Sequence, residues 1–220
     1  MSPRRPAVNA ELRRRSRERL LRATVELVAE RGYEATTLGD IADRSGSARG
    51  LISYYFPGKR HLLQSAVHRL MHLRVEEALL RAPAPHGENA GDETLARAID
   101  AVLTIAVDQP VLMRAHMAGL LQQEGFVHCV EQQRLGTLLR GALVAHGSAD
   151  PETDYPILRA LLMGAVVAVL LPGAALPAAR LRAELFDRYR LEWERGFPPS
   201  SETAPAPDGP AAPPAPATDG

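Results

Sequence analysis

The stretch from Thr37 to Phe56 most constrains the fold of this chain, because it has the pattern of two short helices that meet at a tight turn. Thr37 can cap the first helix, and Asp40 stands three residues later, where the partner in a capping box belongs. Gly46 lies where the helical pattern breaks, and glycine tolerates the positive φ that a sharp turn between helices needs. The stretch therefore predicts a helix-turn-helix unit.

The second helix of this unit is expected at about Ala48 to Tyr55 and has two different faces. Leu51, Ile52 and Tyr55 lie three or four residues apart, so they share one face and can point toward a core. The other face carries the small and polar residues Arg49, Gly50, Ser53 and Tyr54. A face of this kind suits contact with the major groove of DNA.

The run from Ile41 to Leu62, IADRSGSARGLISYYFPGKRHL, resembles the DNA-binding signature of the tetracycline-repressor (TetR) family of bacterial transcriptional regulators. The positions that match the family pattern are Gly46, Gly50, Tyr55, Phe56, Lys59 and Leu62. The chain departs from the pattern at Ser47, Ala48 and Ser53, where the family usually has an apolar residue, a capping Ser or Thr, and often an aromatic residue. Sequence readout is therefore expected to depend mainly on Arg49 and Tyr54.

The resemblance implies an all-α fold, with an amino-terminal three-helix DNA-binding head on a larger helical body for effector binding and dimerisation. It also implies a repressor that leaves a palindromic operator in double-stranded DNA when a small, largely apolar molecule binds. Arg49, Gly50, Ser53 and Tyr54 are expected to face the bases, and Thr37, Tyr55 and Lys59 to hold phosphates. For Tyr55 the alternative is a place in the core, because it is in helical phase with Leu51.

The charge of the chain is divided by position, although the net charge is zero. Residues 1–60 carry 13 basic and 7 acidic residues, a balance of +6, and the remainder carries 13 basic and 19 acidic residues, a balance of −6. A basic amino-terminal part on an acidic remainder is expected of a DNA-binding head joined to a separate body. On charge alone, a solvated basic face without a partner is the alternative.

The sequence divides into four segments: a flexible arm (1–11), the helix-turn-helix domain (12–58), the helical body (59–197) and a disordered tail rich in proline and alanine (198–220). The apolar spacing in the body is helical throughout, without the alternation of β-strands. The tail has no large apolar residue with which to build a core.

Two carboxy-terminal helices are candidates for the dimer interface. The helix expected at Tyr155 to Leu171 is apolar around much of its circumference, and the helix expected at Ala178 to Gly196 is amphipathic. In the TetR family the last two long helices form a four-helix bundle with their copies, which implies interface residues Leu161, Ala165, Ala168, Leu185, Tyr189 and Trp193. The alternative is that the apolar helix is the core of a monomer.

An effector cavity is expected among the remaining body helices, because flexible apolar side chains there are mixed with a few polar groups. The candidates for its lining are Met113, His116, Met117, Leu120, Phe126, Cys129, Gln132 and Met163. The alternative is an ordinary helical core, where methionine and leucine at helical spacing are found more often than in a ligand site.

Catalysis, metal binding and cofactor binding are not expected. Cys129 is the only cysteine, and no nucleophile elbow or phosphate loop occurs. His68 and His72 are four residues apart, but no third ligand accompanies them. No secretion signal is recognisable, and the longest apolar run, Ala160 to Leu171, is too short to span a membrane, so a cytoplasmic location is expected. The remaining alternative is an architectural DNA-binding protein without an effector.

Overall fold

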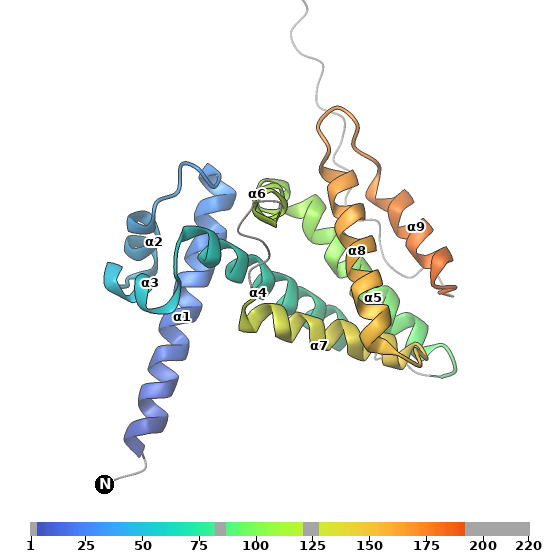
Figure 1. The fold of residues 1–220 in the computed structure, drawn as a ribbon, viewed down its shortest axis with the longest axis horizontal. Helices are drawn as coiled ribbons and strands as arrows, with labels where there is room; N and C mark the ends of the chain where they lie inside the picture. Colours follow the sequence, from blue (N-terminus) through green and yellow to red (C-terminus); the bar gives the residue numbers. More distant parts are fainter. Residues whose placement is uncertain (1–3, 82–86, 121–127, 192–220) are drawn as a thin grey trace, which may run out of the picture.

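The computed structural model describes residues 4–81, 87–120 and 128–191, and within these ranges every regular element is an α-helix. Figure 1 shows a small head at one end of the molecule and a larger helical body at the other. The helices are α1 (Arg4–Arg31), α2 (Leu38–Ser45), α3 (Arg49–Tyr55), α4 (Lys59–Leu80), α5 (Ala90–Asp108), α6 (Pro110–Leu120), α7 (Val130–Ala145), α8 (Pro151–Leu170) and α9 (Ala178–Arg188). The predicted all-α fold is confirmed.

The turn between α2 and α3 has the chemistry that the sequence predicts. The hydroxyl of Thr37 accepts a hydrogen bond from the backbone N–H of Asp40 at 3.1 Å, and the Asp40 carboxylate accepts one from the backbone N–H of Thr37 at 2.9 Å. This capping box satisfies two backbone donors at the start of α2. Gly46 ends α2 in the left-handed region, with φ 60° and ψ 36°, where a side chain would be strained.

A compact apolar cluster holds the head together. It joins α1, α2 and α3 to the first turns of α4, so that the core of the head continues into the first helix of the body. Its members are Leu20, Leu21, Ala23, Leu27, Ile41, Ala42, Ile52, Phe56, Leu62 and Ala66. Phe56 directly follows α3 and is 1% exposed, so the aromatic residue of the family signature anchors α3 to α1.

Helix α1 is longer than the sequence predicts. A flexible arm over residues 1–11 was expected, but α1 already begins at Arg4. Pro6 falls in the first turn, where a helix has no N–H bond to lose. Ion pairs along one side then offset the repulsion among the arginines: Glu11 pairs with Arg14 at 2.7 Å and with Arg15 at 2.6 Å.

The body is built around α4, which packs against both α5 and α7, while α8 and α9 lie at the end of the molecule away from the head (Figure 1). One apolar cluster spans α4 to α9 and includes the fully buried Leu95, Ile99 and Leu103 of α5. A buried Arg97 ties α5 to the carboxy-terminal end of α4, because its guanidinium donates to Glu93 and to the backbone carbonyl of Arg81. The head is therefore carried on a helix that also runs through the centre of the body.

Two helix boundaries differ from the predicted ones. Helix α7 begins at Val130, because Cys129 has an extended backbone and caps the helix: its Sγ accepts a hydrogen bond from the backbone N–H of Gln132 at 3.4 Å. Cys129 is thus not in the middle of a helix. Helix α9 ends at Arg188, and the residues from 192 onward, which include Trp193 and the predicted tail, lie outside the described residues.

Helix α8 corrects the expectation that no stretch is long enough to span a membrane. By length and composition alone, Pro151–Leu170 passes that test, as the core helix of a soluble protein also does. Only 33% of its most apolar window is buried within the protomer. Its apolar character therefore exceeds what packing within one chain uses.

The contact between α5 and α7 depends on a residue without a side chain. A Cβ placed on Gly91 would lie 2.7 Å from the carbonyl carbon of Ala145 and still closer to its oxygen. An alanine side chain at position 91 would therefore clash with the backbone of α7. We predict that Gly91→Ala lowers the free energy of unfolding by about 1–3 kcal/mol through overpacking. Gly141→Ala is the matched control: its Cβ would enter open space in α7, and we expect it to raise stability by about 0.5–1 kcal/mol. Urea unfolding measures both, and equal effects of the two substitutions would contradict this packing.

Candidate functional site

The outward face of α3 is free for contact with another molecule. Ile52 is buried and Leu51 is half-buried, whereas Tyr54 is 66% exposed. The other outward residues, Arg49, Gly50 and Ser53, are exposed as well. A Cβ on Gly50 would have no heavy atom within 4 Å, so no other side chain covers the backbone of α3 at this point. The four residues predicted to face the bases therefore lie together on one exposed face.

The three residues predicted to hold phosphates lie around this face. Thr37 is exposed at the start of α2, and its hydroxyl takes part in the capping box. Tyr55 is half-buried and packs on the core of the head, with its ring centroid 4.9 Å from that of Tyr54. Lys59 begins α4, where its Nζ lies 4.2 Å from the centre of the Tyr33 ring and donates to the carbonyl of Glu34 at 3.4 Å. Tyr55 thus has part of the core role that the sequence left open.

The body contains a cavity of about 60 Å³ between α4, α5, α6, α7 and α8. Six of the eight predicted residues line it: Met113, His116, Met117, Leu120, Gln132 and Met163. Phe126 lies outside the described residues. Cys129 is buried behind the wall, where its Sγ lies 3.3 Å from the Nδ1 of His68.

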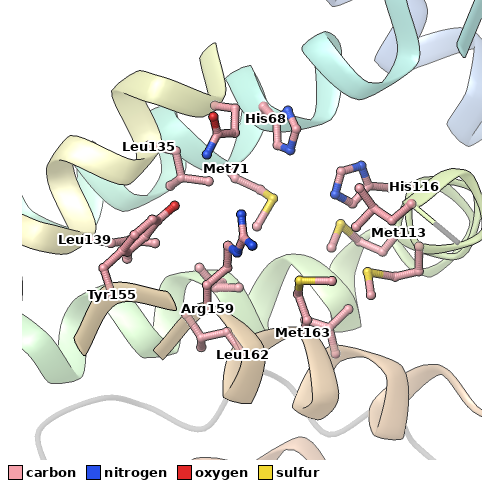
Figure 2. Close-up of a pocket in the computed structure, with 15 residues that line it drawn as sticks. His68, Met71, Met113, His116, Leu135, Leu139, Tyr155, Arg159, Leu162 and Met163 are labelled. Carbon is pink, nitrogen blue, oxygen red and sulfur yellow. The ribbon is translucent and has the colours of Figure 1, made fainter. Parts of the chain in front are cut away.

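The remaining lining residues were not predicted. They are His68, Met71, Val102, Leu135, Leu139, Tyr155, Arg159, Leu162 and Val166. Figure 2 shows Tyr155, Arg159, Leu162 and Met163 facing the cavity from α8, opposite His68 and Met71 of α4. The spacing of this α8 set follows one side of a helix, a signal that was present in the sequence but hidden by the overall apolarity of the helix.

Two buried imidazoles form part of the cavity wall. Burial lowers the pKa of His116 to about 3 and that of His68 to about 4, with the charge of Arg159 as a further cause at His68. Both rings are therefore neutral at pH 7, and their centroids lie 5.1 Å apart in an edge-to-face arrangement. The Nδ1 of His116 has no hydrogen-bond partner among the described residues. The wall thus offers an unused polar atom next to apolar surface.

A part-buried ion pair connects the head to the body near this cavity. The guanidinium of Arg17 in α1 donates to both carboxylate oxygens of Glu131 in the first turn of α7, one of these contacts at 3.0 Å. Glu131 is only 3% exposed, and the same guanidinium lies 4.9 Å from the centre of the Phe56 ring. Two residues before Glu131, Cys129 contacts His68 of the cavity wall. Groups in the head core and in the cavity wall are thus linked through the start of α7.

The comparisons with known proteins identify the head. A sequence profile described as "Bacterial regulatory proteins, tetR family" matches residues 20–66, which contain α2, α3 and the core of the head. The head therefore carries the DNA-binding domain of the TetR family. It is similar to the HTH-type transcriptional repressor KstR of Mycobacterium tuberculosis, with 42% identity over 62 residues. That alignment covers 28% of each chain, so it spans less than a third of the curated repressor.

Longer but weaker similarities cover the body of the chain. The HTH-type transcriptional regulator BetI of Serratia proteamaculans is 28% identical over 173 residues, which cover 78% of this chain and 84% of that protein. Thermus thermophilus FadR, a TetR-family repressor solved in complex with lauroyl-CoA, matches with a TM-score of 0.62 at 21% identity, over 88% of this chain and all of that one. A TetR regulator from Rhodococcus sp. RHA1 matches with a TM-score of 0.61 at 17% identity, over 84% of this chain and 99% of that one. These structural matches extend the family fold to the whole described body.

The relatives that match the head are named as transcriptional regulators, which agrees with the prediction that the chain is no enzyme.

The two buried imidazoles predict how stability depends on pH. Both protonate in the unfolded chain near pH 6.5 but resist protonation when folded, so the unfolded state binds more protons below pH 6.5. We expect the free energy of unfolding to fall between pH 6.5 and 5, by up to about 1.4 kcal/mol per pH unit for each histidine. Urea unfolding at pH 7, 6 and 5 measures this slope. His116→Gln should make it shallower, and an unchanged slope in that variant would contradict the assignment.

Proposed function

We propose that the protein is a homodimeric repressor that binds a palindromic operator in double-stranded DNA and leaves it when a small molecule occupies the body cavity. The observation that carries this proposal is the exposed outward face of α3 in a segment that matches the DNA-binding domain of the TetR family. Relatives named as transcriptional repressors support it. A transcriptional regulator of this kind works in the cytoplasm, where the chromosome of a bacterium lies.

In this proposal the outward face of α3 enters the major groove. Arg49 and Tyr54 supply the longer polar side chains, Ser53 a small one, and Gly50 leaves room for a base or phosphate to approach. Thr37, Tyr55 and Lys59 contact phosphates at the edges of the groove. The basic balance of residues 1–60 adds attraction that does not depend on sequence.

Dimerisation through α8 and α9 explains the incomplete burial of α8. Ala165 and Leu185 are each 6% exposed and belong to the apolar cluster of the body within the protomer. The interface that we propose therefore uses the residues of α8 that remain open, with Leu161 and Ala168 of the predicted set. The open side carries Ile157, Ala160, Leu161, Gly164, Val167, Ala168 and Leu171. Two copies related by two-fold symmetry would present two heads to the two halves of a palindrome.

The response to a ligand follows from the size of the cavity. Binding sites for drug-sized molecules have volumes of roughly 300–1,000 Å³, whereas this cavity has about 60 Å³. A drug-sized ligand must therefore move the walls of the cavity apart. Helix α4 forms one of these walls with His68 and Met71. Because Leu62 and Ala66 of the same helix belong to the core of the head, displacement of α4 changes the separation of the two heads. The ligand then favours a state in which the heads no longer match their half-sites.

Footprinting on the DNA upstream of the gene tests this function directly. The proposal expects protection of a palindrome by the protein alone and loss of that protection with some members of a small-molecule series. Protection of DNA without sequence preference, or a monomer in light scattering of the DNA-free protein, would contradict it.

Two substitutions separate base readout from phosphate binding. We predict that Arg49→Ala weakens specific binding by about 1–3 kcal/mol and relaxes the preference at one base pair. Lys59→Ala should weaken binding to all sequences alike and reduce the slope of log affinity against log salt by about 1. Fluorescence anisotropy with the operator and with single-base variants, over a salt series, measures both effects. An unchanged preference for Arg49→Ala, or an unchanged salt slope for Lys59→Ala, would contradict the role of that residue.

A further inference from the structure

The cavity has a chemical character that goes beyond a generally apolar site. We propose that its ligand is a monocarboxylate on an apolar aliphatic or aromatic body, and that the carboxylate binds the guanidinium of Arg159. This inference rests on the proposed function of the cavity as the effector site, and it names the class of compound that the cavity selects.

The charge of the lining carries the first step. Of the 15 residues that line the cavity, Arg159 is the only one that is charged at neutral pH, because His68 and His116 are neutral and no lining residue is acidic. A single positive charge in a region of low dielectric creates a strong local potential. That potential favours an anion, is indifferent to a neutral molecule and repels an amine.

The geometry around Arg159 fits a carboxylate. Figure 2 shows its guanidinium extending from α8 into the space between Tyr155 on one side and His68 and His116 on the other. A guanidinium presents parallel N–H groups that match the two oxygens of a carboxylate. A phosphate ester, with about two negative charges, would call for a second cation, whereas Arg159 is the single cation among the 15 lining residues.

His116 supplies a second, independent observation. Its side chain is 4% exposed, and its Nδ1 lacks a hydrogen-bond partner among the described residues. Leaving a buried polar atom unpaired is costly, so such an atom in a cavity wall indicates a missing partner. When the neutral imidazole of His116 carries its proton on Nδ1, this N–H can donate a hydrogen bond to an oxygen of the bound ligand.

The rest of the lining fits the apolar body of the ligand. Ten of the 15 residues are aliphatic or methionine, and four of the five methionines of the chain, Met71, Met113, Met117 and Met163, lie in this one wall. Methionine side chains are unbranched and flexible, so they can repack around ligands of different shape. The cavity therefore combines one fixed anion-binding group with a wall that can expand.

The test compares matched ligands on the full-length protein. Isothermal titration calorimetry with octanoate, octanol and octylamine, and with benzoate and benzyl alcohol, separates charge from apolar size. We expect at least one of the two carboxylates to bind about 10-fold or more tightly than its alcohol, because a charge-assisted hydrogen bond contributes more than a neutral one. Octylamine should bind more weakly than octanol.

Variants of Arg159 locate the effect. Arg159→Gln should remove the preference for the carboxylate while leaving the affinity for the alcohol within about 3-fold, since the apolar wall is unchanged. Arg159→Lys should keep part of the preference because it keeps the charge. Arg114→Gln is the matched control: Arg114 is exposed on α6 and does not line the cavity, so the preference should be retained.

Three results would overturn the inference: equal or tighter binding of the alcohols, an undiminished preference in Arg159→Gln, or no binding of either carboxylate at millimolar concentration. Operator binding by the ligand-free protein, measured in parallel, keeps the two proposals apart. A protein that binds its operator and releases it with a neutral compound, but not with a carboxylate, retains the proposed function and contradicts only the ligand class. A protein that binds no operator contradicts the proposed function itself.

Discussion

The ion pair between Arg17 and Glu131 links the two parts of this molecule. Glu131 is almost fully buried, and a carboxylate in such a place needs a compensating charge. Arg17 provides it from α1, and the same guanidinium rests on the ring of Phe56 in the core of the head. The negative charge also lies in the first turn of α7, where the helix dipole favours it. Removing Arg17, or moving it away, would leave the buried carboxylate of Glu131 unpaired, so displacing the head from α7 costs free energy.

This ion pair is one of the packing connections between the head and the body. Helix α4 contributes Leu62 and Ala66 to the core of the head and His68 to the wall of the cavity. Helix α7 contributes Glu131 to the ion pair and, through Cys129, a contact with that same histidine. Two helices therefore reach from the cavity to the head, and a cavity too small for most ligands must move at least one of its walls to admit one. The proposed response to an effector is a consequence of this packing.

The sequence predicts the local features of the fold well and the features that depend on tertiary contacts poorly. The capping box of Thr37, the turn at Gly46 and the exposed face of α3 depend on residues close in the chain, and each was predicted. The pairing of Arg17 with Glu131 joins residues 114 positions apart, and no local pattern indicates it. The start of α1 was misplaced because prolines and arginines suggested an arm, whereas the ion pairs of Glu11 support a helix.

The residues of the candidate cavity were likewise predicted only in part. Six lining residues were predicted from their mixture of flexible and polar side chains, but Arg159 was missed because it lies in a helix that was assigned to the dimer interface. Ala165 and Leu185 were expected at that interface, although one side of α8 is needed to pack against the protomer's own α9. The residues of a helix that lines a cavity on one side and faces solvent on the other can be assigned to these two sides only when the helices that pack against it are known.

The central claim is that the body sets the position of the head through the ion pair, and operator affinity in a double-mutant cycle of Arg17→Met and Glu131→Gln tests it most directly. On charge alone, removing Glu131 should strengthen DNA binding, because an anion is lost from the protein. The account predicts the opposite: Glu131→Gln weakens operator binding, and the double variant is no weaker than Arg17→Met, with a coupling free energy of about 1 kcal/mol or more. Thermal unfolding confirms that each variant is folded at the temperature of the assay. Unchanged or tighter operator binding by Glu131→Gln, or losses that simply add, would contradict the account.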